Sequence, residues 1–389
     1  MRITAIREVA VPLQGYMANA VVDFSHHTVS MVALISDQFR HGKPVIGLGF
    51  NSIGRFAQSG IMRDRMIPRL LASKPAQLLD PNTHTFAPSA VVQVAMQNEK
   101  PGGHGDRCSA VAAIELATWD LNAKLMEQPA YAHIADVLGR TPTPGGIPVY
   151  AAGGYYYAED SNARLHDEIS RYREDGYHAF KIKVGGQSLA EDLSRVETAI
   201  EAAHGASRVA VDANGCFSIT RAQQYSQALS SYQLKWFEEP CDPLDYRSLS
   251  QLAKDYTGSI ATGENLFSAI DTQNLIRYGG LRAAHDVLQM DPGLSYGLTE
   301  YLKMIEIAEA AGFTRRQCIP HGGHLINLHI ATALNLGGCE AYPGVFQPFG
   351  GYTPACILSE GRIVPSDAPG FGLEQKSELA PIIRQLGDN

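Results

Sequence analysis

The pattern of hydrophobic and polar residues changes near residue 147. Before that point, two runs rich in β-branched residues, VSMVALIS (29–36) and KPVIGLGF (43–50), predict strands of a β-meander. The later stretch CSAVAAIELATWDLNAKLM (108–126) has apolar residues at helical spacing and predicts a helix. Strands followed by helices indicate an α+β domain over residues 1–140.

Beyond residue 147, short apolar runs alternate with longer stretches that carry apolar residues at a helical period. This alternation is typical of repeated βα units around a parallel sheet. We therefore predict an α/β fold, a barrel of βα units over residues 141–354. The predicted strands are IPVYAAGG (147–154), AFKIKVGG (179–186), RVAVDANG (208–215), KWFEEP (235–240), SIATGE (259–264), DVLQMD (286–291), RQCIPHGG (316–323) and, more weakly, ALNLGGCEAYPG (333–344).

Ionisable residues end six successive predicted strands at steps of 26 to 30 residues. One βα unit of a barrel takes about 30 residues, because eight of them make about 250 residues. The carboxyl ends of barrel strands meet at one mouth, where active sites are built. We therefore expect six side chains to converge there: Lys183, Asp212, Glu238, Glu264, Asp291 and His321.

Three of these side chains are carboxylates on adjacent strands, namely Asp212, Glu238 and Glu264. Three negative charges within a few ångströms stay ionised only if positive charge lies between them. Oxygen ligands without His or Cys favour Mg²⁺ over zinc, with water or substrate oxygens completing the octahedron. The alternative is that each carboxylate pairs with its own surface lysine. This would explain a single carboxylate well, but it explains poorly why three occupy equivalent positions on successive strands.

Acid and base candidates lie on either side of these carboxylates. Lys181 and Lys183 are two residues apart in FKIKV, so in a strand both point to one face. Repulsion between two ammonium groups in a partly dry site lowers a lysine pKa, which makes Lys183 a candidate base and Lys181 its electrostatic partner. Asp291 can accept from the imidazole of His321, which fixes its tautomer and raises its pKa. A surface strand and a core histidine are the alternatives.

A substrate carboxylate bound to the metal would place its α-carbon between Lys183 and His321. The α-proton of a carboxylate is too weakly acidic for lysine to remove unaided, so the metal must stabilise the enediolate that forms, as in enolase-type sites. The sequence therefore predicts an enzyme that removes a proton next to a carboxylate.

Composition and charge argue against several other classes of protein. The 389 residues carry a formal net charge of -8, with acidic and basic residues scattered, so the basic stripe that nucleic acid requires is missing. Neither a run of 18 apolar residues nor the apolar core of a signal peptide is found, so no membrane span is expected. Six widely spaced cysteines without CxxC fit reduced thiols in the cytoplasm.

The motifs KIK, VDANG, WFEEP, ATGEN, LQMD and IPHGGH, in this order and spacing, resemble those of the enolase superfamily, mandelate racemase subgroup. The match covers essentially the whole chain. It implies a modified (β/α)7β barrel over residues 141–354 and an α+β capping domain over residues 1–140, to which a tail over residues 355–389 returns. It also implies Mg²⁺ on the three carboxylates, Lys183 as base, and His321 with Asp291 as acid/base pair. Relatives form dimers and higher even-numbered oligomers, so a homo-oligomer is expected.

Within this family, GFNSIGR, NEKPGGHG, VYAAGGYYY, DPLDY, ATGENLFS, LSYGLTEY and FQPFGGY resemble stretches of the D-tartrate dehydratases. That resemblance implies substrate contacts by Asn51 and Lys100 in loops of the cap, where Lys100 would pair with the second carboxylate of tartrate. A turn residue and a solvated lysine are the alternatives. Asn214 and Glu340 are further expected substrate contacts. The pair Pro240-Cys241 departs from the tartrate pattern, which leaves room for a related substrate.

The reaction that these residues predict is a β-elimination of a small carboxylate substrate. Lys183 removes the C2 proton of D-tartrate, Mg²⁺ stabilises the enediolate, and His321 protonates the departing 3-hydroxyl, giving oxaloacetate. Four alternatives stay open: a dehydratase of another sugar acid, a racemase or epimerase of a 2-hydroxy acid, a class I aldolase with Lys183 as nucleophile, and a metal-stabilised binding protein on the same barrel.

Overall fold

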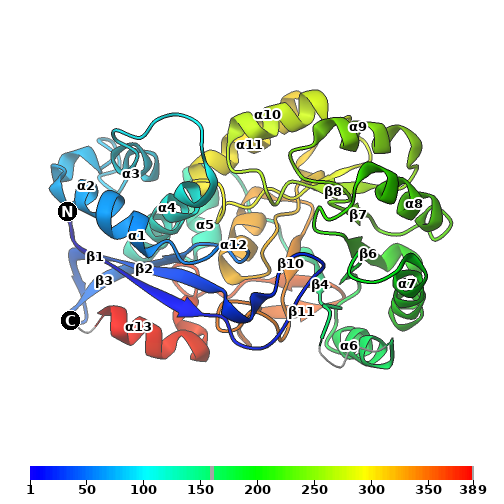
Figure 1. Cartoon of the computed structure of the whole chain (residues 1–389). Helices are drawn as coiled ribbons and strands as arrows, with labels where there is room; N and C mark the ends of the chain where they lie inside the picture. The colour runs from blue at the N-terminus through cyan, green and yellow to red at the C-terminus, as the bar shows by residue number, and fades with distance from the viewer. Residues whose placement is uncertain (158–161, 388–389) are drawn as a thin grey trace.

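The computed structural model describes residues 1–157 and 162–387, and Figure 1 shows a smaller cap on the left beside a barrel on the right. The cap is an antiparallel sheet in the order β1-β2-β3, accompanied by helices. The N-terminus and the end of the described chain at residue 387 both lie on the cap. Its elements are β1 (Ile3–Pro12), β2 (Thr28–Arg40), β3 (Lys43–Phe50), α1 (Ser59–Ile61), α2 (Ile67–Ala72), α3 (Pro88–Ala95), α4 (Gly105–Leu125) and α5 (Ala130–Val137).

Strand β1 is the one element of the cap sheet that the hydrophobic pattern did not predict. Its residues are mostly half-buried, and Arg7 and Glu8 interrupt the apolar alternation. It forms because β2 offers a continuous antiparallel partner, with Val9 opposite Met31. Pairing across the sheet, rather than local sequence preference, therefore decides this strand.

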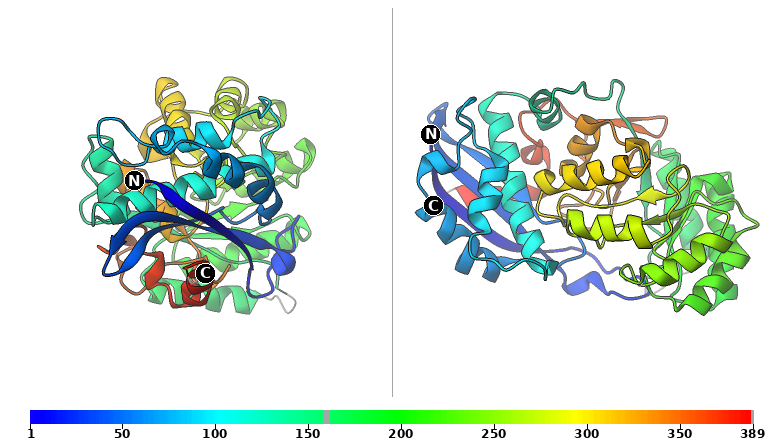
Figure 2. Two further views of the ribbon diagram at one scale, coloured as in Figure 1. Left: turned by 90° about the vertical axis from the view of Figure 1, so that its left-hand side faces the viewer. Right: turned by 90° about the horizontal axis from the view of Figure 1, so that it is seen from above.

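The barrel alternates buried parallel strands with helices, which confirms the predicted fold class. The strand order is β4-β5-β6-β7-β8-β9, and β10 pairs with the other side of β4. Figure 2 shows the helices on the outside of these strands. The strands are β4 (Ile147–Ala152), β5 (Phe180–Lys183), β6 (Val209–Asp212), β7 (Phe237–Glu238), β8 (Ile260–Thr262), β9 (Val287–Leu288) and β10 (Cys339–Ala341). The helices are α6 (Asn162–Glu174), α7 (Leu189–Ala203), α8 (Ile219–Leu229), α9 (Tyr246–Asp255), α10 (Ala269–Tyr278), α11 (Leu298–Ala310) and α12 (Leu325–Leu334).

The strand predicted over residues 316–323 does not form a regular ladder. A single parallel bridge joins Cys318 to Leu288, and the Ile319 N–H donates to the Leu288 carbonyl at 2.9 Å. Pro320 has no N–H to continue the pairing. The segment nevertheless runs beside β9, so His321 still reaches the mouth of the barrel.

The tail after residue 355 contacts both parts of the molecule. Its first section forms the hairpin β11 (Ile357–Ser359) and β12 (Arg362–Val364), and β12 pairs antiparallel with barrel strand β4. Its last helix, α13 (Ala380–Gly387), packs on the cap, where Arg7 Nη1 donates to the Leu386 carbonyl at 2.8 Å. The expected return of the tail to the cap thus describes its final helix, whereas the hairpin extends the barrel sheet.

Helix α4 connects cap and barrel through a buried carboxylate. Glu115 is fully buried, and its oxygens accept from the backbone N–H groups of Leu298 and Thr299, both at 2.9 Å. These amides begin helix α11 of the barrel, whose preceding residue, Gly297, offers no side-chain cap. Thr299 Oγ1 and Trp119 Nε1 also donate to Glu115. A cap residue therefore satisfies the start of a barrel helix.

Replacing Glu115 by alanine is expected to lower the free energy of unfolding by at least about 3 kcal/mol, because two buried and two partly buried donors lose their acceptor. Urea unfolding followed by circular dichroism measures the change. The control is Glu306→Ala at an exposed position on α11, which should change stability by less than about 0.5 kcal/mol. Equal shifts in the two variants would contradict this role of Glu115.

Candidate active site

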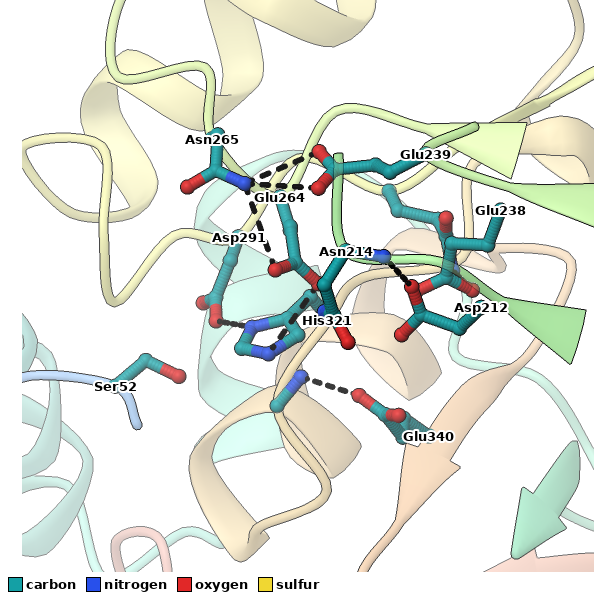
Figure 3. A network of polar contacts seen from close by, with 12 residues as sticks. Ser52, Asp212, Asn214, Glu238, Glu239, Glu264, Asn265, Asp291, His321 and Glu340 are labelled. Carbon is teal, nitrogen blue, oxygen red and sulfur yellow. Dashed lines mark hydrogen bonds and ion pairs between the residues drawn. The ribbon is translucent and has the colours of Figure 1, made fainter. Parts of the chain in front are cut away.

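Three carboxylates meet at the carboxyl ends of the barrel strands, as Figure 3 shows. Asp212 ends β6, Glu238 ends β7 in register with it, and Glu264 lies two residues beyond β8. One oxygen of each lies within 4.8 Å of the others. The structure thus brings together the three ligands that the sequence spacing predicted.

The three carboxylates need positive charge nearby if all of them are to stay ionised. Burial and the carboxylate of Asp212 raise the pKa of Glu238 to about 8, although Lys181 opposes them. Burial also acts to raise the pKa of Asp212, but Lys183 and Lys181 hold it at about 2. An oxygen-only donor set with this demand for charge fits Mg²⁺, the cofactor expected from the sequence.

Lys181 and Lys183 are both buried and share one carboxylate, that of Asp212. Lys183 Nζ lies 2.5 Å from Asp212 Oδ2, and Lys181 Nζ lies 3.7 Å from the same oxygen. Lys181 Nζ also lies 2.6 Å from Glu238 Oε1 and 2.8 Å from Glu340 Oε1. Burial acts to lower the pKa of Lys181, but Glu238 and Glu340 raise it well above the ordinary value. Lys181 is therefore a fixed cation of the site, and its effect on Lys183 stays a prediction.

His321 and Asp291 form the expected pair, with Nδ1 and Oδ2 3.0 Å apart (Figure 3). Asp291 is held on its other oxygen, where Oδ1 accepts from the Gly293 N–H at 2.7 Å and from Asn327 Nδ2 at 3.0 Å. Burial acts to lower the pKa of His321, but Glu264 and Asp291 raise it to about 9. Asp291 thus engages Nδ1 of His321, and Nε2 lies on the other side of the ring, 3.1 Å from Tyr342 Oη.

A cavity of about 560 Å³ at the barrel mouth is lined by Lys183, Glu264 and His321. The sheet order separates Lys183 on β5 from His321, which follows β9, by the three ligand-bearing strands β6 to β8. Lys183 and His321 therefore approach the cavity from opposite sides of the triad. This arrangement can remove a proton on one side of a bound acid and deliver one on the other.

Asn214 and Glu340 lie in different places relative to the cavity. Asn214 lines it, and its backbone N–H donates to Asp212 Oδ1 at 2.8 Å (Figure 3). Its own Oδ1 is buried and accepts no hydrogen bond from residues 1–157 or 162–387. Glu340 is bonded to Lys181 and accepts from the Gly322 N–H at 2.8 Å. Contact of either with substrate stays a prediction.

Asn51 and Lys100 are not among the described residues that line the cavity. Asn51 is fully buried, and its Oδ1 accepts from the Ser30 N–H at 2.7 Å. Its Nδ2 faces the carbonyls of Ser52 at 3.3 Å and Arg55 at 3.4 Å, so it shapes the loop after β3. Lys100 is exposed in a cap loop. Neither side chain lines the cavity in this structure, and contact of either with substrate stays a prediction.

Sequence reasoning missed several polar residues that line the cavity, among them Arg55 and Tyr342. Tyr342 Oη lies 3.1 Å from His321 Nε2, the nitrogen that faces the cavity. Tyr342 lies two residues after Glu340, so strand periodicity could have placed it on the same face. Arg55 lies in GFNSIGR, a stretch that had been assigned to the cap loops without a role for its arginine.

Comparison with known proteins places this site in a family. The enolase C-terminal domain-like family matches residues 164–379. The chain is 28% identical over 284 residues to arabinonate dehydratase of Saccharolobus solfataricus, covering 70% of this chain and 71% of that protein. It is 28% identical over 344 residues to L-talarate/galactarate dehydratase of Salmonella typhimurium, covering 88% and 80%.

A solved structure extends the comparison to the fold. L-talarate dehydratase from Polaromonas sp. JS666, complexed with Mg and L-glucarate, matches with a TM-score of 0.78 at 23% identity, covering 98% of this chain and 96% of that one. The shared architecture includes cap and barrel, and the magnesium of that complex agrees with the donor set found here. The chain therefore belongs to the enolase superfamily, in the mandelate racemase group with an enolase C-terminal domain-like barrel.

Proposed function

We propose that this protein is a magnesium-dependent dehydratase of hydroxy acids, and that D-tartrate, converted to oxaloacetate and water, is its substrate. The observation that carries the proposal is the position of Lys183 and of the His321–Asp291 pair on opposite sides of one carboxylate triad, in one cavity. The dehydratases among its relatives support the reaction class. The cap-loop sequences that resemble the tartrate enzymes support the substrate.

Elimination of water needs one base and one acid from this chain. Lys183 Nζ, as an unprotonated amine, accepts the proton from C2, and the C–H electron pair forms the C2–C3 double bond as the C3–O bond breaks. His321 Nε2 gives its proton to the departing hydroxyl, which leaves as water. The resulting enol tautomerises to oxaloacetate. Asp291 keeps Nδ1 protonated throughout, so Nε2 is the nitrogen that reacts.

Asp212, Glu238 and Glu264 would hold the magnesium ion. When bound, Mg²⁺ supplies positive charge that makes a proton next to a carboxylate more acidic. Lys181 adds a fixed cation beside Glu238, and Asn214 offers a buried amide oxygen at the edge of the triad.

The same two catalytic groups favour one alternative, racemisation or epimerisation at C2. A base and an acid on opposite sides of one carbon can remove a proton from one face and return one to the other. Deuterium from solvent would then enter at C2 without loss of water. Elimination instead couples C2 deprotonation to formation of a 2-keto acid.

Several expectations about the whole protein stay predictions, namely cytoplasmic location, homo-oligomeric assembly and the lack of a nucleic-acid partner. Among residues 1–157 and 162–387, no helix has both the length and the apolar surface to span a bilayer. All six cysteines are free thiols.

A substrate screen tests the proposal directly. Purified protein with Mg²⁺ is offered D-, L- and meso-tartrate together with aldonic and aldaric acids, and 2-keto acid formation is followed by semicarbazide absorbance. Oxaloacetate from D-tartrate, with little from the other stereoisomers, is the expected result. Turnover of a longer sugar acid with no tartrate turnover would disprove the tartrate assignment and keep the dehydratase.

Removal of either catalytic group should lower kcat at least about a hundredfold, the usual contribution of a general acid or base. Lys183→Met should lose both turnover and exchange of the C2 proton with D₂O, as followed by NMR. His321→Asn should lose turnover but keep C2 exchange, because Lys183 still reaches that proton. Loss of exchange in the His321 variant alone would assign the two roles the other way round.

Chelation should abolish turnover, and added Mg²⁺ should restore it, because the triad then regains its balancing charge. Mg²⁺ should also raise the melting temperature of the wild type, since a ligand that binds only the folded state stabilises it. Glu264→Gln should lose this shift, whereas Glu201→Gln, an exposed change on α7, should keep it. Turnover that survives chelation would favour the class I aldolase alternative, in which Lys183 forms a Schiff base with the substrate.

A further inference from the structure

Among the described residues, most positively charged side chains that line the cavity contact a carboxylate, but one does not. Lys181 and Lys183 contact carboxylates of the triad, and His321 contacts Asp291. Arg55 lines the same cavity but has no carboxylate partner among residues 1–157 and 162–387. Its guanidinium makes one hydrogen bond, from Nη2 to Asn265 Oδ1 at 2.9 Å, and lies 4.7 Å over the ring of Phe267. A guanidinium has five donors, so most of them stay available for a ligand.

Neighbouring contacts fix where Arg55 lies. Asn265 directly follows the triad residue Glu264, and its Nδ2 donates to Glu239 at 2.9 and 3.1 Å (Figure 3). The Asn265 side chain therefore accepts from Arg55 of the cap through its oxygen and donates to Glu239 of the barrel through its nitrogen. The Arg55 side chain is half-buried, and its planar group rests on Phe267. Both contacts pre-organise the guanidinium, which lowers the entropy lost when it binds an anion.

The loop that carries Arg55 is itself held against the barrel. Ser52 Oγ lies 3.0 Å from His324 Nε2, and the Ser52 N–H donates to the Gly293 carbonyl at 3.1 Å. Asn51 binds the inner side of the loop through the Arg55 carbonyl, at 3.4 Å. The cap therefore places one positively charged side chain at the cavity, on the loop that contacts the segments around Asp291.

We propose that Arg55 binds the second carboxylate of a dicarboxylic hydroxy acid whose first carboxylate lies at the triad. The inference rests on the proposed function, because that function places the first carboxylate. A guanidinium and a carboxylate match as a two-pronged, charge-assisted pair. Arg55 thus takes the role that the sequence had suggested for Lys100, which is exposed and outside the cavity lining. The substrate class is a diacid rather than a monoacid.

The alternative is that Arg55 only connects the cap to Asn265 and never contacts substrate. In that case its removal would weaken every ligand alike, because the cavity wall would loosen. A binding site for a carboxylate would instead make the loss specific to diacids. A pair of ligands that differ only in the second carboxylate separates the two interpretations.

Malate and 2-hydroxybutyrate are such a pair, and neither carries the 3-hydroxyl that elimination would remove. Their affinities are measured by titration calorimetry with Mg²⁺ present. Wild type should bind malate more tightly, and Arg55→Met should weaken malate at least about tenfold while leaving 2-hydroxybutyrate within about twofold. Arg55→Lys should retain part of the malate affinity, since it keeps the charge and loses the planar fork.

Arg63→Met, an exposed change on the cap, is the matched control and should bind both ligands as wild type does. Equal weakening of both ligands by Arg55→Met, unchanged malate affinity, or no malate binding to wild type would each overturn the proposal. The result is independent of turnover. A wild type that binds malate through Arg55 but dehydrates no acid would disprove the proposed function and uphold the diacid site.

Discussion

Asp212 and Glu238, both buried, and the partly buried Glu264 lie at the barrel mouth with one oxygen of each within 4.8 Å of the others. Such a cluster is unfavourable in a protein interior unless cations balance it. Lys181 and Lys183 provide part of that charge, and the raised pKa of Glu238 shows that more is needed. The need for a divalent cation follows from these carboxylates, and Glu264, together with Asp291, also raises the pKa of His321.

Repeated βα units of the barrel bring the carboxylates together, whereas a loop of the cap brings Arg55 to the cavity. Parallel pairing places Lys183 level with Asp212, and Asp212 level with Glu238. The loop after β3 then covers the mouth and brings Arg55 to the cavity. The proposed reaction therefore uses side chains on short strands, and the proposed ligand selection uses a loop that Asn51, Ser52 and Asn265 hold in place.

Prediction from the sequence worked best where one local pattern was repeated. Six ionisable residues at barrel spacing were enough to expect the triad and the His321–Asp291 pair, and the structure brings these together. The same reasoning failed for β1. Its polar residues interrupt the apolar pattern, and the strand is defined by its pairing with β2. The reasoning also failed to find Tyr342 at His321, since a contact between two strand ends depends on the closure of the sheet.

The sequence by itself determined the fold class and the meeting of the three carboxylates and of His321 with Asp291, because strand periodicity and βα spacing fix which side chains reach one end of a barrel. Tertiary structure alone decided which cap residues line the cavity. Asn51 faces into its own loop, Lys100 is exposed and Arg55 reaches the cavity, although all three lie in loops of the cap. Loop conformation depends on contacts with distant segments such as Asn265 and His324, and no local pattern encodes those contacts.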